Sequence, residues 1–216
     1  MPTTIPLEAP KSETYYVLSR SETLAHLPKP VGRVLDVGCA GGGAATLLRE
    51  GGATWITGVE MLPEPAALAA QVYDQVLVGD ALTELPRADG PFDTILCYDV
   101  LEHLFDPLAL ISALLDVAAP NGRLHISVPN ASHVSLLRDL IFKGTFGYQP
   151  AGHRDATHVR WFTRRDIMAL VGEGGWRVET VAYSQLHRSR FLHTLTRGRS
   201  TEFLAGQWYV LARNQA

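Results

Sequence analysis

The feature that most constrains this chain is a short apolar strand that ends in a glycine-rich turn and leads directly into a helix. Residues 33–37 form the strand, residues 38–43 contain four glycines, and residues 44–50 are mostly helix formers that Gly51 ends. A glycine turn lets the backbone approach a ligand closely, and the N–H groups at the helix start suit an anionic or polar group. The chain therefore opens with a strand–turn–helix unit that contains a candidate binding turn.

The same alternation of strand and helix continues along the chain. Strands are predicted at residues 54–59, 75–78, 92–97 and 123–128, and helices at residues 64–71 and 106–119. Asp106 and Pro107 are typical of an N-cap and the first helical residue after it. Alternation at these lengths predicts an α/β fold, with a mostly parallel sheet covered by helices on both faces.

The two ends of the chain depart from this rhythm. Residues 1–30 are predicted to form an arm and a lead-in helix at 12–27, followed by a single domain at 31–216. A helix is predicted at 132–142. The roughly twenty residues after it are rich in Gly, His and Arg, and a connecting loop of that length usually has a function. A capping-box variant at Thr163 opens a helix to residue 172. Strands at 176–184 and 207–213 close the fold.

Composition narrows the partners and the compartment. The net charge is −3 and the pI is about 6.2, whereas nucleic-acid-binding domains commonly have a pI above ~9. Two cysteines in apolar runs are too few for a disulfide framework. No run approaches the ~18–20 apolar residues of a membrane span, and the start lacks a secretory pattern. We expect a cytoplasmic monomer or homodimer that binds a small molecule, and neither nucleic acid nor a membrane.

Three predicted strands in a row end in a carboxylate, at Asp36, Glu60 and Asp80. Asp36 would repel a pyrophosphate and favour a cation, and Glu60 can accept both ribose hydroxyls of an adenosine. Asp80 and the N–H of Ala81 can bind the amino edge of adenine. Alternatively, each carboxylate simply caps the turn after it. The dinucleotide fingerprint G-x-G-x-x-G is broken at Ala40. The pattern therefore favours an adenosine cofactor of positive character over a dinucleotide.

In combination, these motifs resemble the class I S-adenosylmethionine-dependent methyltransferases. The resemblance covers about residues 31–184 and rests on Glu60 and on the runs at 34–42, 79–81, 92–95 and 120–124. It implies S-adenosylmethionine as cofactor and a doubly wound, Rossmann-like sheet of seven strands, mostly parallel with an antiparallel last strand. The family often has Gly where this chain has Ala40, a change expected to cost little because it adds only a methyl group.

The same resemblance implies a set of binding residues. Asp36, Gly38 and the Gly41 region would hold the methionine moiety, Glu60 the ribose, and Asp80 with Ala81 the adenine. The complete cofactor-binding set implied in this way is Tyr16, Arg20, Asp36, Gly38, Cys39, Ala40, Gly41, Glu60, Met61, Asp80, Ala81, Tyr98 and His103.

Two shorter segments resemble particular members of the family. The run D-A-T-H-V-R-W-F-T at 155–163, with Tyr15, Tyr16 and Arg20, resembles a subgroup often encoded beside glycan and natural-product assembly genes, which implies methylation of a small-molecule or sugar intermediate, more on oxygen than on nitrogen. The run D-V-L-E-H at 99–103 is similar to the E-V-L-E-H run linked to a divalent metal in ubiquinone-pathway O-methyltransferases. Asp99 shortens one ligand, and we expect no ion, although a site of Asp99, Glu102 and His103 stays open.

Methyl transfer from a sulfonium is an in-line displacement, which needs positioning and a water-poor site rather than a covalent enzyme intermediate. A hydroxyl acceptor also benefits from a general base. We predict His158 as this base with Asp155 as its orienting partner, and His103 as a further catalytic residue. The excursion at about 130–162, where the family builds its substrate cover, supplies the predicted substrate-binding residues His133, Tyr148, His153, Arg160 and Trp161.

Two further groups of polar residues stand out in the sequence. The basic run at 187–199, with Arg164 and Arg165, is a candidate wall for an anionic acceptor, against a default of solvated charge. His125 lies between apolar neighbours and is expected to be a packing residue.

Two other functions stay open. A nicotinamide-dependent oxidoreductase could use the same layered scaffold, but Ala40 breaks its fingerprint and no Tyr-x-x-x-Lys pair for hydride chemistry is present. A non-catalytic module that binds the cofactor and serves as an assembly partner would share the binding residues without turnover.

Overall fold

The computed structural model describes residues 21–150, 152–184 and 200–216. Seven strands form one sheet in the order β3-β2-β1-β4-β5-β7-β6. The strands are β1 (Gly32–Val37), β2 (Ala53–Glu60), β3 (Gln75–Val78), β4 (Phe92–Tyr98), β5 (Ala118–Pro129), β6 (Arg177–Tyr183) and β7 (Gln207–Arg213). All neighbours pair in parallel except β7, which is antiparallel to β5 and to β6. The predicted fold class, including the antiparallel last strand, is confirmed.

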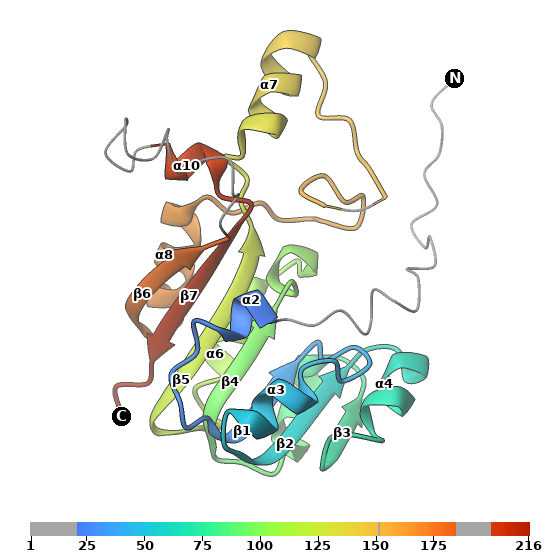
Figure 1. Cartoon of the computed structure of the whole chain (residues 1–216), viewed down its shortest axis with the longest axis vertical. Helices are drawn as coiled ribbons and strands as arrows, with labels where there is room; N and C mark the ends of the chain where they lie inside the picture. Colours follow the sequence, from blue (N-terminus) through green and yellow to red (C-terminus); the bar gives the residue numbers. More distant parts are fainter. Residues whose placement is uncertain (1–20, 151, 185–199) are drawn as a thin grey trace.

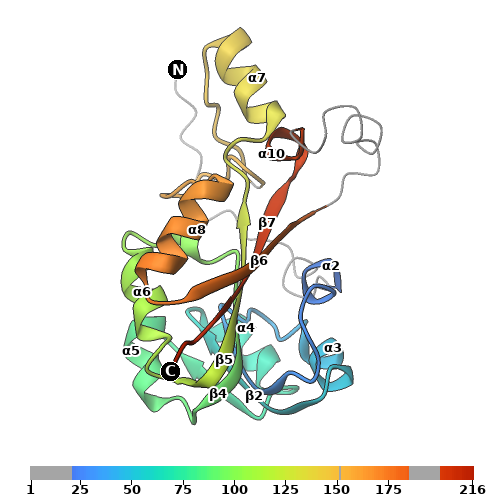
Figure 2. The same cartoon turned by 90° about the vertical axis from the view of Figure 1, so that its left-hand side faces the viewer.

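Helices cover the sheet on both sides (Figures 1 and 2). They are α2 (Ser21–Leu24), α3 (Ala45–Glu50), α4 (Pro63–Ala69), α5 (Ala81–Glu84), α6 (Pro107–Ala113), α7 (Val134–Lys143), α8 (Arg164–Glu173) and α10 (Thr201–Leu204), with short 3-10 turns η1 (Leu85–Arg87) and η2 (Leu101–His103). Figure 2 places α5, α6 and α8 on one side of the sheet and α2 and α3 on the other. None of the helices in the described ranges has the length and hydrophobicity needed to cross a bilayer.

The core lies in two layers, one against each face of the sheet. Neighbouring residues of β1 point to opposite faces, so Leu35 joins the cluster of α6 and α8, and Val34 joins the cluster of α2 and α3. Both side chains are fully buried. A strand buried on both faces is mostly apolar, and Val34, Leu35 and Val37 fit this rule, whereas Asp36 is a buried polar exception.

Local capping signals set two helix starts as predicted. The Asp106 side chain accepts a hydrogen bond from the Ala109 N–H at 3.1 Å, and Pro107 is the first helical residue of α6. Thr163 and Asp166 satisfy each other's backbone N–H groups in a complete capping box that opens α8. Each cap supplies partners for backbone groups that have none inside the helix.

The predicted end of α6 is wrong. The helix was expected to reach residue 119, but it ends at Ala113, and β5 begins at Ala118 instead of residue 123. The Phe92 N–H donates to the Val117 carbonyl at 2.9 Å, and Phe92 of β4 pairs with Ala118. Pairing with β4 therefore overrides the helix propensity of these residues, which local sequence cannot reveal.

The chain between β5 and α8 leaves the sheet and returns to it at one point. Asn130 and Phe162 form an isolated parallel bridge, and the segment between them carries α7, which projects beyond the end of the sheet (Figures 1 and 2). The predicted helix at 132–142 corresponds to α7. Of the predicted lead-in helix at 12–27, the structure describes α2, which ends at Leu24. The basic run at 187–199 lies outside the described residues.

Candidate functional site

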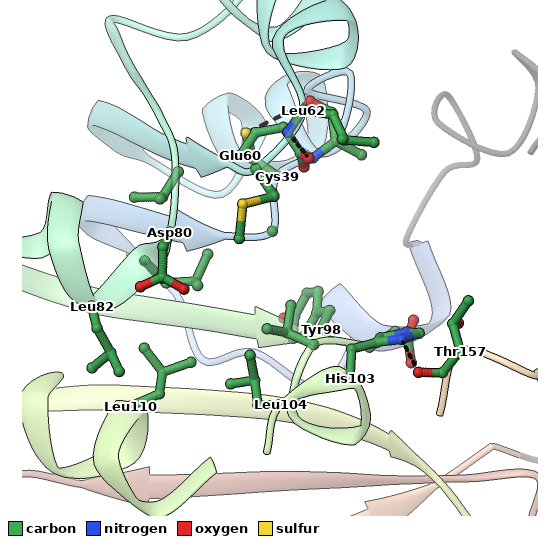
Figure 3. Close-up of a pocket in the computed structure, with 18 of the residues that line it drawn as sticks. Cys39, Glu60, Leu62, Asp80, Leu82, Tyr98, His103, Leu104, Leu110 and Thr157 are labelled. Atoms are coloured by element: carbon green, nitrogen blue, oxygen red, sulfur yellow. Dashed lines mark hydrogen bonds between the residues drawn. The ribbon is translucent and has the colours of Figure 1, made fainter. Parts of the chain in front are cut away.

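A cavity of about 1110 Å³ opens at the carboxyl ends of the first strands (Figure 3). Its wall is built from turns and strand ends that the sheet order brings together. The lining residues include Gly38, Cys39, Ala40, Glu60, Met61, Asp80, Ala81, Tyr98, Asp99, His103, Thr157, Gln207 and Tyr209. The cavity lies where β1 separates β2 from β4, the switch point at which doubly wound sheets bind ligands.

The glycine turn after β1 forms one wall and is held close to β2. The N–H groups of Gly38 and Cys39 both donate to the Val59 carbonyl, at 2.8 and 3.2 Å. Gly38 has φ +69°, and a Cβ there would lie 2.4 Å from a methyl group of Val100. This position requires glycine both for its backbone conformation and for space.

Ala40 has φ +48°, in the left-handed region. The cost of having Ala there was underestimated, because a residue with a Cβ in that region is destabilised by about 1–2 kcal/mol. The Ala40 N–H donates to Oε2 of Glu60 at 2.9 Å, which offsets part of that cost. The two residues thereby link the turn after β1 to the turn after β2.

Glu60 is fixed at the cavity edge by two backbone groups. Besides Ala40, the Leu62 N–H donates to Oε1 at 3.0 Å. The carboxylate is thus held in one orientation, and it also caps the turn after β2, as in the alternative interpretation of this residue. Each carboxylate oxygen can accept more than one hydrogen bond, so both oxygens can also accept from a ligand in the cavity.

The other two predicted carboxylates lie differently. Asp80 lines the cavity and is the N-cap of α5, accepting from the Thr83 N–H at 3.4 Å. Asp36 is fully buried behind the cavity wall, and its Oδ2 accepts from the Tyr73 hydroxyl at 2.7 Å. The neighbours of Asp36, Val37 and Gly38, line the cavity in its place. Asp36 is absent from the cavity wall, and contact between its carboxylate and the methionine moiety stays a prediction.

The predicted catalytic histidines come together at the end of η2. Their rings are arranged edge to face, with centroids 4.8 Å apart, and Nε2 of His158 lies 4.0 Å from Oε1 of Glu102. His103 lines the cavity, whereas His158 is 7% exposed and lies behind it. The Val159 and Arg160 N–H groups both donate to the Glu102 carbonyl, at 2.8 and 3.0 Å. The segment between β5 and α8 is thereby attached to η2.

Asp155 holds the turn that leads to His158, and that turn contacts His103. Its Oδ1 accepts from the N–H and the hydroxyl of Thr157, at 2.9 and 2.7 Å. The Thr157 carbonyl lies 3.2 Å from Nδ1 of His103. A carbonyl only accepts, so Nδ1 of His103 must be the protonated nitrogen in this contact. Orientation of the His158 ring by Asp155 stays a prediction.

The residues that could hold an ion differ from the predicted set. Glu102, His103 and His158 offer ligand atoms that all lie within 4.8 Å of one another. Asp99 takes another role, since its Oδ1 accepts from the Ser127 hydroxyl at 3.0 Å and the Gln207 amide at 2.8 Å. One carboxylate and two imidazoles suit a transition-metal ion better than magnesium or calcium.

The predicted substrate-binding residues His133, Tyr148, His153, Arg160 and Trp161 are absent from the cavity wall in the described part of the chain. Nε of Arg160 donates to the carbonyl of Phe105 at 3.2 Å, and Phe105 lines the cavity. The rings of His133 and His153 are stacked 4.6 Å apart. Burial lowers the pKa of His133, and the charge of His153 lowers it further. Tyr16 and Arg20 lie outside the described residues.

Sequence reasoning missed the contribution of β7. Gln207 and Tyr209 line the cavity, and the Tyr209 hydroxyl donates to Oε1 of Gln207 at 3.3 Å. Burial raises the pKa of Tyr209 to about 12, so its hydroxyl is protonated. The apolar run of β7 predicted a strand but not its place beside β5, because pairing partners are set by long-range contacts.

His125 is more than a packing residue. Its Nδ1 lies 2.6 Å from the hydroxyl of Tyr98, a residue of the cavity wall, and both side chains are buried. Burial lowers the pKa of His125 to about 3, with a smaller contribution from His26. The neutral imidazole can therefore accept the Tyr98 hydroxyl proton and hold the ring in place.

Comparisons with known proteins agree with this geometry. Residues 12–181 match a family model described as a methyltransferase domain. The chain is 38% identical over 107 residues to the ubiquinone biosynthesis O-methyltransferase of Xylella fastidiosa, covering 45% of this chain and 42% of that protein. It is 33% identical over 143 residues to the protein of the same name from Xanthomonas campestris pv. campestris, covering 58% of each. The chain spans about half the length of the curated relatives it matches.

Solved structures share the fold over nearly the whole chain. A SAM dependent methyltransferase from Archaeoglobus fulgidus aligns with a TM-score of 0.67 at 18% identity, over 94% of this chain and 97% of that one. An S-adenosylmethionine dependent methyltransferase from Mesorhizobium loti aligns with a TM-score of 0.60 at 17% identity, over 90% and 96% of the two chains. At these identities the likeness establishes the common fold.

Proposed function

The chain belongs to the methyltransferase domain family, and on that premise we propose that it transfers a methyl group from S-adenosylmethionine to a hydroxyl group of a small-molecule acceptor. One observation carries the proposal: Glu60 ends β2, Asp80 follows the neighbouring β3, and both line one cavity beside the Gly38 turn. Two carboxylates and a close backbone suit a nucleoside with a positive charge, and a carboxylate is a poor neighbour for a pyrophosphate.

The residues of the cavity fit this cofactor. The fixed carboxylate of Glu60 would accept the ribose hydroxyls, and Asp80 with the Ala81 N–H would bind the adenine edge. Met61 and Tyr98 form further parts of the cavity wall. When bound, S-adenosylmethionine supplies an electrophilic methyl group for in-line displacement. The chain's own contribution is to orient the acceptor and to exclude water.

His103 is the general base in this proposal, in place of His158, because it lines the cavity. With Nδ1 protonated toward the Thr157 carbonyl, Nε2 carries the lone pair that can take the acceptor's proton. Asp155 supports His103 through Thr157. Glu102 lies beside His158 in the same cluster, where a carboxylate would stabilise an imidazolium once the proton has moved.

A metal-dependent variant of the same reaction is the second candidate, favoured by the convergence of Glu102, His103 and His158. Those three residues would hold the ion, which would polarise the acceptor hydroxyl. His103 would then be a ligand and could not be the base. Removing metal separates the two candidates, because only the second loses activity.

The acceptor is proposed by class. The curated relatives carry the name ubiquinone biosynthesis O-methyltransferase, which supports transfer to oxygen. A sugar or natural-product intermediate is the other proposed acceptor class, and it rests on the run at 155–163 alone. An acceptor panel should therefore contain phenols and catechols as well as sugar intermediates.

Two measurements test the proposal. Calorimetric titration with S-adenosylhomocysteine and with NADH should show binding of the first alone, and binding of NADH alone would support an oxidoreductase. Transfer of labelled methyl groups across the acceptor panel should then give product on at least one acceptor. Cofactor binding without turnover on any acceptor would instead support a non-catalytic module.

A further inference from the structure

α7 presents an unusual distribution of side chains for a helix at a protein surface. Leu136 and the charged Asp139 are buried, while four other apolar side chains of the helix are exposed. The exposed fractions are 45% for Val134, 47% for Leu140, 71% for Ile141 and 80% for Phe142. The helix stands beyond the end of the sheet, with Ile141 and Phe142 in its last turn, farthest from β5 (Figures 1 and 2). Exposed apolar side chains gathered on one short helix are typical of an interaction site.

Three cations of the projecting segment meet at one carboxylate, and the side chains of two of them, Arg138 and Lys143, are 60% exposed. Arg138, Lys143 and Arg154 lie 3.0, 3.1 and 3.2 Å from the carboxylate of Asp139. Hydrogen bonds from Lys143 and Arg138 hold the pKa of Asp139 below its ordinary value, so the carboxylate is ionised at neutral pH. One negative charge therefore lies among three positive charges. Residues 132–162 contain four Lys or Arg against two Asp, whereas the whole chain has a net charge of −3. The projecting segment is therefore positive on a negative protein.

An aromatic cluster belongs to the same projecting segment. The ring of Phe146 lies 5.2 Å from that of Tyr148 and 5.3 Å from that of Trp161. Tyr148 is 50% exposed and Trp161 is 38% exposed. Tyr and Trp have an apolar ring and a polar group, which suits them to the boundary between water and lipid.

We propose that α7 and the aromatic cluster form a docking surface for an anionic lipid bilayer. Ile141 and Phe142 enter the acyl boundary, while Arg138 and Lys143 remain at the level of the lipid phosphates. The sequence argued against a membrane partner because it contains no spanning segment, but surface binding needs only a short amphipathic helix. A second copy of the chain fits less well, because pairing two such faces would bring their cations together. The proposal does not depend on the acceptor or on the methyl transfer.

Flotation of the full chain with vesicles tests the proposal. Vesicles of phosphatidylcholine alone are compared with vesicles that also contain about 30% phosphatidylglycerol. We expect binding to the anionic vesicles, and loss of most of it when the salt concentration rises from about 0.1 to 1 M. The Ile141→Ser, Phe142→Ser double variant should bind at least about tenfold more weakly, since transfer of one such side chain alone changes a partition constant about tenfold.

The matched control is the Leu68→Ser, Val72→Ser double variant, which removes exposed apolar side chains at 47% and 46% exposure from another part of the surface. It should bind vesicles like the unmodified chain. Both variants should keep their circular dichroism spectrum and their affinity for S-adenosylhomocysteine, and the single Phe142→Ser variant serves if the double variant is unstable. No binding to anionic vesicles overturns the proposal. So does equal binding by all variants, or a vesicle-independent dimer that Ile141→Ser, Phe142→Ser dissociates.

Discussion

Replacing Glu60 by Gln changes one charge at the cavity without changing the size of the side chain. Its carboxylate accepts from the N–H groups of Ala40 and Leu62 at 2.9 and 3.0 Å. Gln keeps one accepting oxygen and places an NH₂ group against the other N–H, so one backbone donor loses its partner. That loss costs about 1–2 kcal/mol of folding stability. It falls on a turn in which Ala40 already has φ +48°.

Glu60→Gln should also weaken cofactor binding. If Glu60 accepts both ribose hydroxyls through charge-assisted bonds, Glu60→Gln should weaken binding of S-adenosylhomocysteine by about 1–3 kcal/mol, or about 5- to 150-fold in Kd. Calorimetric titration measures the affinity, and urea unfolding measures the stability. Glu64→Gln is the matched control, because Glu64 is exposed in the first turn of α4 and outside the cavity wall. An unchanged Kd for the Glu60 variant would refute the ribose-binding role.

Three further predictions concern the catalytic cluster and the buried polar core. His103→Ala should lower turnover by about 10²–10⁴-fold while leaving the Kd of S-adenosylhomocysteine within a few-fold, and near-normal turnover would exclude His103 as base. Full activity after exhaustive chelation is expected if His103 is the base, and activity that returns only with added metal would assign the Glu102 cluster to an ion. His125 has a pKa of about 3 in the folded protein, below the unfolded value of about 6.5, so unfolding takes up a proton and stability falls as the pH drops below about 6.5. Between pH 7 and pH 5 the unmodified chain should lose about 2 kcal/mol more than His125→Asn in urea unfolding, and equal losses would contradict the neutral-histidine account.

Local patterns predicted the parts of the fold that local energies decide. Asp106, Pro107 and the Thr163 capping box set helix starts through contacts within one turn, and all are found where expected. The end of α6 depends on the pairing of Phe92 with Ala118, which are far apart in the sequence, and that boundary was wrong. The same limit hid the contribution of β7 to the cavity.

The candidate site divides in the same way. Glu60 and Asp80 were placed at the cavity because each ends a strand, and strand ends share one edge of the sheet. Asp36 pairs with Gly58, so it lies two residues deeper in the sheet than Glu60, and its carboxylate accepts from Tyr73 instead of lining the cavity. The choice between His103 and His158 as base required knowing which ring faces the cavity, and no spacing rule supplies that information.

The most direct test of the central claim is a crystal structure of the chain with S-adenosylhomocysteine. We expect the ribose hydroxyls at the Glu60 carboxylate and the adenine at Asp80, with the thioether end toward Tyr98 and His103. A nucleoside bound away from Glu60 and Asp80 would contradict the account.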